Sequence, residues 1–295
     1  MEFLKKYGPQ KLFGNKDANN GLSNYVPGAS NSESESSIMK LAFLILVFFV
    51  FLLLFRVVLR IVTYFVAPSD SPYLVSGVAD AKQMIEIPQD PGTKNAVTIK
   101  RSTNEEDGVE FTYSVWIYID DLEYKKGQYR HIFHKGEESI NFDDDNVGVG
   151  INYPNNAPGL YIAPNTNNLL VVMNTFQNII EKVSINNVPL NKWVNVVIRC
   201  DNRTLDVYVN GSISRRHILS GLPHQNYGNV FVSLNGGFDG YTSRLRYYDY
   251  AIGTREIDKI IAIGPSTDIK TDDALQNQDY NYLSFKWYTT GQLAK

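Results

Sequence analysis

The longest apolar run in the chain covers residues 41–55 and contains no charged residue, no Gly and no Pro. Because the run has no polar stripe, no face of a helix formed by it would prefer water. The apolar character continues through Arg56 and Arg60 to Val66, which exceeds the about 20 residues that a helix needs to cross a bilayer. The length of the run and its distance from Met1 favour a transmembrane helix over residues 38–66, rather than a buried core helix or a signal peptide. The residues expected to anchor it are Leu41, Phe55, Arg56 and Arg60.

The segments that flank this helix are polar or rich in proline. Residues 1–37 contain many Gly, Asn and Ser, which is typical of a flexible tail. Prolines punctuate residues 67–95, so we expect a stalk there, with one short edge strand over residues 83–87.

From residue 96 onward, apolar and polar positions alternate in short runs separated by turn residues. This period of two predicts β-strands. In residues 111–119 both sets of alternate positions are largely apolar, as expected for a strand inside a packed sandwich. One face of that strand carries Phe111, Tyr113, Val115, Ile117 and Ile119. Further strands are predicted over residues 194–200, 205–209, 230–234 and 241–250.

Local signals mark a hairpin and a helix near the end of the domain. Asn210-Gly211 separates two predicted strands, and a type I′ turn needs the positive φ angles that Asn and Gly tolerate best. Residues 254–263 are predicted to be helical, with Thr254 as the N-terminal cap and Gly264-Pro265 as the end.

Several of these runs resemble the laminin-G-like domains of the concanavalin A-like lectin and glucanase superfamily. The similarity lies in residues 111–117, 131–136, 189–197, 205–211 and 237–251. It implies a mainly β fold: a jelly-roll sandwich of two antiparallel sheets over residues 96–264, behind an N-terminal transmembrane helix. We assign structural roles to Trp116, Trp193, Tyr208, Gly211 and Gly240.

Charge and cysteine content narrow the functional classes. The net charge is -3, which gives no overall basic field for nucleic acid. The single cysteine, Cys200, excludes an intrachain disulfide and leans toward a reducing compartment. Next to the helix, Arg56 and Arg60 exceed Lys40 by one positive charge, which favours the cytosolic side for the domain that follows.

Glycosidase chemistry is disfavoured by the position of the acidic residues. Retaining glucanases of this superfamily place paired carboxylates on one sheet face, about 5 Å apart. The only similar run here is residues 256–261, which contains Glu256 and Asp258 but no second Glu. It falls on the predicted helix. We therefore expect no catalytic residues and no enzyme.

An acidic loop is the one candidate metal site. Asp143, Asp145 and Asn146 offer oxygen ligands suited to Ca²⁺, but their spacing fits no defined calcium loop, and a solvated turn is the favoured interpretation. No other cofactor is expected. His131 and His134 are three residues apart on a predicted strand, so we expect them on opposite faces, unable to share a metal.

Exposed aromatic and amide side chains are the candidates for sugar binding. Aromatic platforms beside planar polar groups are typical of such sites. The candidates are Tyr153, Asn155, Asn156 and Tyr227. The alternative is that these residues serve turn geometry and packing. Asn202 and Asn210 match glycosylation sequons, which act only in a lumenal compartment.

The whole chain also resembles structural proteins of large DNA viruses that contain an internal membrane. That resemblance implies a non-catalytic minor capsid protein that links the membrane to the capsid shell, with bilayer lipid and other capsid proteins as partners. The domain would then face the cytosolic, capsid-facing side of a virion membrane. The alternative is a membrane-anchored cell-surface lectin that binds carbohydrate. In both cases the apolar tail over residues 265–295 is expected to pack on the domain or on a partner.

Overall fold

The computed structural model describes residues 32–66, 68–102 and 109–268. The chain divides into two compact units, Met1–Val62 and Thr63–Lys295. We describe each unit by itself.

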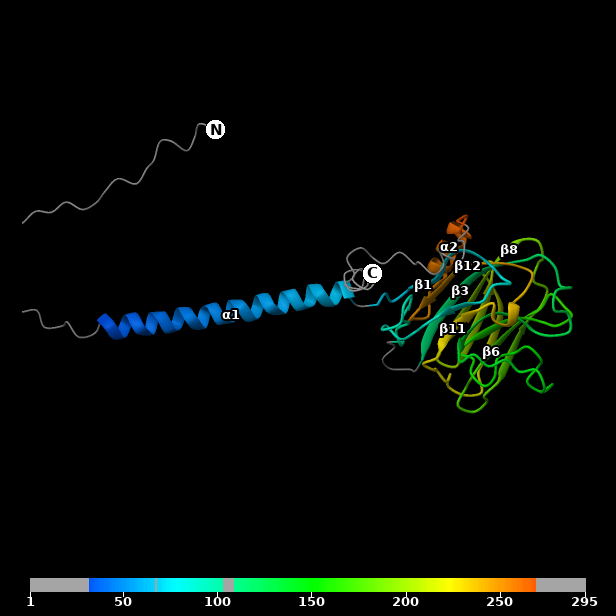
Figure 1. Cartoon of the computed structure of the whole chain (residues 1–295), viewed down its shortest axis with the longest axis horizontal. Coiled ribbons are helices and arrows are strands. Elements are labelled where there is room, and N and C mark those ends of the chain that lie inside the picture. The colour runs from blue at the N-terminus through cyan, green and yellow to red at the C-terminus, as the bar shows by residue number, and fades with distance from the viewer. Residues whose placement is uncertain (1–31, 67, 103–108, 269–295) are drawn as a thin grey trace, which may run out of the picture. The chain divides into compact units, whose positions relative to one another are not determined.

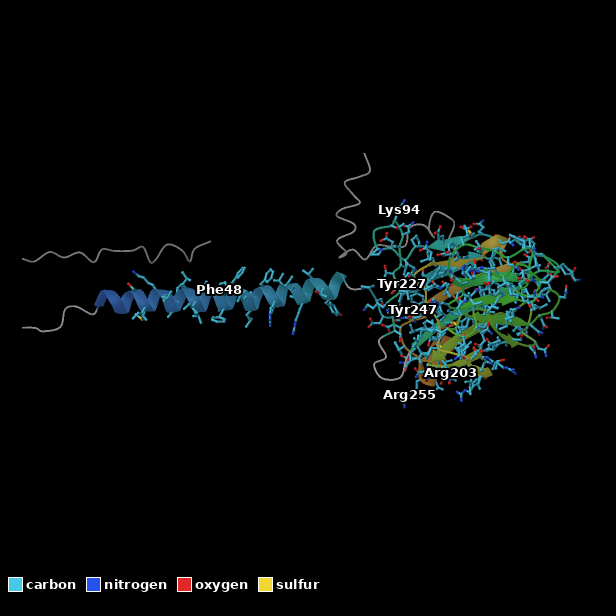
Figure 2. The ribbon with its side chains drawn as sticks, turned by 90° about the horizontal axis from the view of Figure 1, so that it is seen from below. Phe48, Lys94, Arg203, Tyr227, Tyr247 and Arg255 are labelled. Carbon is cyan, nitrogen blue, oxygen red and sulfur yellow. The ribbon has the colours of Figure 1, made fainter. Side chains whose placement is uncertain are left out.

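The first unit contains most of one long helix, α1 (Ser32–Val66). Its segment Ser37–Tyr64 contains an 18-residue window with a mean hydropathy of 3.1, none of which is buried inside the protein. Figure 2 shows the side chains of this helix, Phe48 among them, projecting from the ribbon on all sides. A soluble core helix of this hydropathy would be covered by protein, so α1 fits a single membrane-spanning helix. The helix begins six residues before the predicted start at residue 38.

The second unit is a sandwich of two six-stranded antiparallel sheets, here called sheet A and sheet B (Figure 1). Sheet A contains, in spatial order, β1 (Tyr73–Asp80), β12 (Gly240–Tyr248), β3 (Glu110–Ile119), β8 (Trp193–Asp201), β9 (Thr204–Val209) and β10 (Ser212–Ile218). Sheet B contains β2 (Ile85–Ile87), β11 (Asn229–Val232), β4 (Arg130–Gly136), β5 (Gly159–Ile162), β6 (Leu169–Met173) and β7 (Glu181–Ile185). A 3₁₀ turn, η1 (Leu234–Gly236), precedes β12, and a helix, α2 (Thr254–Ile263), follows it. The predicted fold class is confirmed.

The core lies between the sheets and follows the predicted alternation. The five inward residues of β3, from Phe111 to Ile119, are all buried in one apolar cluster. The ring of Tyr113 stacks on Phe133 of sheet B with 5.5 Å between the ring centroids. The predicted strands therefore present the expected face to the core.

The prediction of a stalk over residues 67–95 is wrong where the chain forms strand β1. Residues 73–80 form β1, an edge strand of sheet A, and Leu74 and Val75 enter the core. The short edge strand expected over residues 83–87 is present as β2. Pro72 and Pro88 lie just outside these strands, where a missing N–H breaks no ladder hydrogen bond. The prolines mark strand ends here, not an extended spacer.

The hairpin and the second helix occur where predicted. Asn210 and Gly211 have φ angles of 49° and 80°, as a type I′ turn requires. Helix α2 spans residues 254–263 as expected, but its N-terminal cap is Gly253, not Thr254. The Glu256 carboxylate accepts the Gly253 N–H at 3.2 Å and so supplies the cap from inside the first turn.

The residues assigned to structure lie on or beside the outer face of sheet A. Trp116 is buried there, while Trp193 and Tyr208 are half-buried. Tyr208 packs against a small cluster that includes Ile257 of α2, so the helix covers part of this face. Gly240 lies where an added Cβ would be 1.8 Å from the Tyr118 carbonyl oxygen, so any side chain would disrupt the β3–β12 ladder.

Candidate functional site

A pocket of about 450 Å³ opens at one end of the sandwich, where the strand ends of both sheets meet two loops. We call it the tyrosine pocket. Figure 2 shows Tyr227 and Tyr247 close together at this end. Its lining consists of Gln89, Asp90, Thr98, Ile99, Lys100, Arg101, Phe111, Tyr113, Lys135, Ala157, Gln225, Asn226, Tyr227 and Tyr247.

Sheet A supplies an aromatic wall of the tyrosine pocket. Tyr113 on β3 and Tyr247 on β12 meet edge to face, with 5.0 Å between ring centroids. The Tyr247 hydroxyl donates to the Lys100 carbonyl oxygen at 2.8 Å and so ties the 97–101 segment to the sheet. Burial raises the pKa of both phenols, so both stay neutral at physiological pH. The wall is therefore apolar, uncharged and held in place from two strands.

Sheet B supplies a cation. Lys135 follows Phe133 by two positions on β4, so both point between the sheets. The Lys135 ammonium donates to the Gly228 carbonyl oxygen at 2.6 Å. Within the described residues it has no carboxylate within ion-pair distance. Burial lowers the pKa of Lys135 to about 8, because little water reaches the charged form.

The rim of the tyrosine pocket is built from a tight turn. The Asn226 side chain donates to the Lys135 carbonyl oxygen at 3.0 Å and accepts the Gly228 N–H at 3.0 Å. This fixes the turn against the end of β4. Tyr227 lies between Asn226 and Gly228 in this turn, with 86% of its surface exposed. The rim thus presents an open aromatic face on an ordered backbone.

The opposite loop is ordered by Gln89. Its side-chain amide donates to the Ile87 and Val97 carbonyl oxygens at 3.2 and 3.0 Å, and its oxygen accepts the Ile99 N–H at 3.0 Å. One glutamine therefore closes the segment that carries Lys100 and Arg101 to the pocket.

The charge of the tyrosine pocket opposes that of the whole chain. Lys100, Arg101 and Lys135 line it with one carboxylate, Asp90, while the chain carries a net charge of -3. Lys100 is paired with Asp70 at 2.5 Å. Arg101 is exposed and has no ion-pair partner among the residues that the structure describes. The pocket is thus locally positive.

The structure separates the residues predicted to bind sugar. Tyr227 lines the tyrosine pocket, whereas Tyr153 is exposed outside its lining. The backbone of Asn155 and that of Gly228 both lie against Gly136, which brings the two loops near each other.

Asn156 cannot contact a ligand as placed. It is fully buried, and its side chain donates to the Asn152 carbonyl oxygen at 2.6 Å and accepts the Tyr161 hydroxyl at 2.5 Å. It holds the 152–156 loop, as the packing alternative implies.

The acidic loop is a hydrogen-bonded turn. The Asp144 carboxylate accepts the Asn146 N–H at 2.8 Å, and the Asn146 carbonyl oxygen accepts the Lys182 ammonium at 2.9 Å. In the described part of the chain, no three acidic, His or Cys side chains are grouped to hold a metal. Calcium binding by Asp143, Asp145 and Asn146 stays a prediction.

The opposite-face prediction for His131 and His134 is wrong. A β-bulge at Ile132 inserts an extra residue between them, so both histidines fall on the outer face of sheet B. Their Nε2 and Nδ1 atoms are 2.6 Å apart, and both rings are buried. His134 stacks on Phe231, and His131 meets Tyr161 edge to face.

The acidic run considered for glycosidase chemistry lies on α2, as expected from the sequence. Its Glu256 carboxylate caps the helix and also accepts the Tyr250 hydroxyl at 2.8 Å. It is engaged in local structure.

Sequence reasoning missed Lys135, Tyr113 and Tyr247 as pocket residues. The signal for Lys135 was present in the sequence: a lysine two positions after Phe133 occupies the inward face of an apolar strand. For the two tyrosines no local signal distinguishes a pocket wall from a core position.

Comparison with known proteins agrees with this architecture. A family model described as the concanavalin A-like lectin/glucanases superfamily matches residues 91–258. No curated protein sequence matches the chain. Among solved structures, the binding domain of botulinum neurotoxin DC in complex with rat synaptotagmin II is 14% identical, with a TM-score of 0.40; the match covers 52% of this chain and 36% of that one.

The receptor-binding domain of botulinum neurotoxin D is 11% identical, with a TM-score of 0.41, and the match covers 61% of this chain and 48% of that one. The chain therefore spans less than half the length of these structures. The family model, in contrast, matches more than half of the sequence and the strands described above. The chain belongs to the concanavalin A-like lectin/glucanase superfamily.

Proposed function

We propose that this protein is a membrane-anchored, non-catalytic carbohydrate-binding protein, and that the tyrosine pocket holds the sugar. The observation that carries the proposal is Tyr227, an aromatic side chain exposed over 86% of its surface at the rim of a preformed pocket. Sugar rings stack on exposed aromatic faces of this kind.

The polar groups around Tyr227 support the same function. The Gln89 and Asn226 amides are held by backbone groups, whereas Gln225 lines the pocket with no side-chain hydrogen bond among the described residues. A planar amide beside an aromatic ring is suited to the paired hydroxyls of a sugar. The pocket volume of about 450 Å³ falls within the about 300–1,000 Å³ typical of small-molecule sites.

The membrane helix would hold many copies of the pocket on one surface. Anchored copies share one surface, so several weak pockets can bind one branched or repeating glycan at the same time. Attachment of a membrane to a capsid shell stays a prediction, since no contact in the described residues favours a capsid partner over a sugar.

The test is glycan-array binding of the full-length protein in detergent, with the variant Tyr227→Ala. We expect loss of about tenfold in affinity, because an aromatic stacking contact is worth about 1–1.5 kcal/mol. Tyr153→Ala is the matched control, since Tyr153 is also an exposed loop tyrosine but lies outside the pocket.

Equal losses in both variants would place the sugar elsewhere. An array with no bound glycan at all would remove the proposed function.

A further inference from the structure

The geometry points to an acidic sugar as the ligand of the tyrosine pocket, with the carboxylate or sulfate of that sugar bound by Lys135. This inference rests on the proposed function and makes its ligand class specific.

The Lys135 ammonium is the first argument. It lines the pocket, and its only described acceptor is the Gly228 carbonyl oxygen of the rim turn at 2.6 Å. Lys135 is half-buried, and a cation withdrawn from water without a counter-ion is costly. An ammonium has three donors, so one carbonyl leaves capacity for an anion. An acidic group in the pocket would supply the missing partner.

The Tyr113 hydroxyl is the second argument, and it is independent of the first. Tyr113 is only 2% exposed and lines the same pocket. Among the described residues its hydroxyl has no hydrogen-bond partner, whereas the neighbouring Tyr247 hydroxyl has one at Lys100. This hydroxyl is not one of the fully enclosed unpaired atoms of the described residues, so it is open to the pocket. A ligand oxygen in the pocket would satisfy Tyr113 and Lys135 together.

Arg101 extends the positive field to the mouth of the pocket. It is exposed and unpaired in the part of the chain that the structure describes, whereas nearby Lys100 is neutralised by Asp70. A guanidinium suits the planar geometry of a carboxylate or sulfate. A neutral sugar would use none of these charges, so the arrangement favours an acidic one.

Lys135 also ties the rim turn through Gly228, so a purely structural role must be separated from ligand binding. Two substitutions do this in the full-length protein in detergent. Lys135→Met removes the charge and keeps the apolar stem, while Lys135→Arg keeps the charge. Lys192→Met is the control, because Lys192 is exposed and lies outside the pocket lining.

The probes are matched pairs that differ only in charge: sialyllactose and lactose, sulfated and desulfated chondroitin oligosaccharides, and oligogalacturonate and its methyl ester. Binding is measured by calorimetry, and unfolding temperatures are recorded for every variant. We expect at least one acidic member to bind at least tenfold more tightly than its neutral match. Lys135→Met should abolish that difference, Lys135→Arg should keep part of it, and Lys192→Met should keep all of it.

The outcomes separate the inference from the proposed function. If neutral and acidic members bind equally, the sugar site stands and the acidic ligand is wrong. If no member binds, the proposed function itself fails. If Lys135→Met keeps the acidic preference while lowering the unfolding temperature, Lys135 is structural and the anion lies elsewhere.

Discussion

The buried histidine pair shows how a single extra residue changes the chemistry of a strand. The bonds around the pair fit one proton on each ring: Leu234 donates its N–H to His131 Nδ1, His131 donates to His134 Nδ1, and His134 donates to the Glu137 carbonyl oxygen. Each ring is then neutral and fully satisfied. A further proton on either ring would turn an acceptor into a donor and break one of these bonds.

This arrangement predicts lower stability in acid. Burial lowers the pKa of His134 to about 4, and burial together with His134 lowers the pKa of His131 well below its usual value. An unfolded chain binds these protons near pH 6.5, so the folded state loses stability as the pH falls from 6.5 toward 4. The loss from His134 alone is on the order of 3 kcal/mol. Urea unfolding of the full-length protein at pH 7 and pH 4.5 measures it.

The matched variants for that experiment are His134→Asn and His224→Asn. His224 is exposed, so its removal should leave the pH dependence unchanged. His134→Asn should flatten the dependence, although it lowers stability at pH 7. An unchanged slope in His134→Asn would contradict the neutral pair.

At the scale of elements, the alternation of apolar and polar residues predicted most of the strands in the sandwich. Strands β3, β8, β9 and β12 lie within a residue or two of their predicted bounds, because each places alternate apolar residues in the core. Helix α2 was predictable from its ending at Gly264. Strand β1 was not, because the prolines around it outweighed its short apolar run. The bulge in β4 was also missed, since nothing local in the sequence marks the extra residue.

The candidate site was less predictable than the fold for a related reason. Tyr227 was found because exposure of a loop tyrosine can be read from its polar neighbours. The rest of the pocket joins segments more than 100 residues apart, such as Tyr113 and Tyr247. Spacing along one chain does not show which strand ends meet across two sheets.

Helix α1 yields a prediction at the same scale. Deletion of residues 41–66 should convert the protein into a soluble, folded form, because the core residues of the sandwich lie from Leu74 onward. Ultracentrifugation of cell extracts and near-ultraviolet circular dichroism test solubility and tertiary packing. A deletion of residues 5–30 is the control and should remain in the membrane fraction. If the shorter protein still sediments with membranes, α1 is not the anchor.

At the scale of the whole molecule, the side of the membrane decides which glycans the sandwich can meet. The one-charge excess of Arg56 and Arg60 over Lys40 favours the cytosol. Large domains, however, are translocated across the membrane largely regardless of a charge difference this small. Binding of a displayed glycan requires the opposite side.

We therefore expect the sandwich to be protected from added protease in sealed vesicles and to become digestible once detergent opens them. Immunoblots for an epitope at each end of the chain give the readout. Digestion without detergent would place the pocket in the cytosol and exclude extracellular glycans as ligands.

The edge strands of the sandwich affect how membrane-anchored copies of the protein can pack beside one another. In sheet A, β10 has no partner on its far side within the described residues, and its side chains are largely exposed. Unpaired strands invite pairing between copies, and confinement to a bilayer plane raises the frequency of such encounters. Strand β10 carries the exposed Arg215, and β7 at one end of sheet B carries the exposed Lys182. Charges at these margins let many anchored copies crowd together without fusing into a continuous sheet.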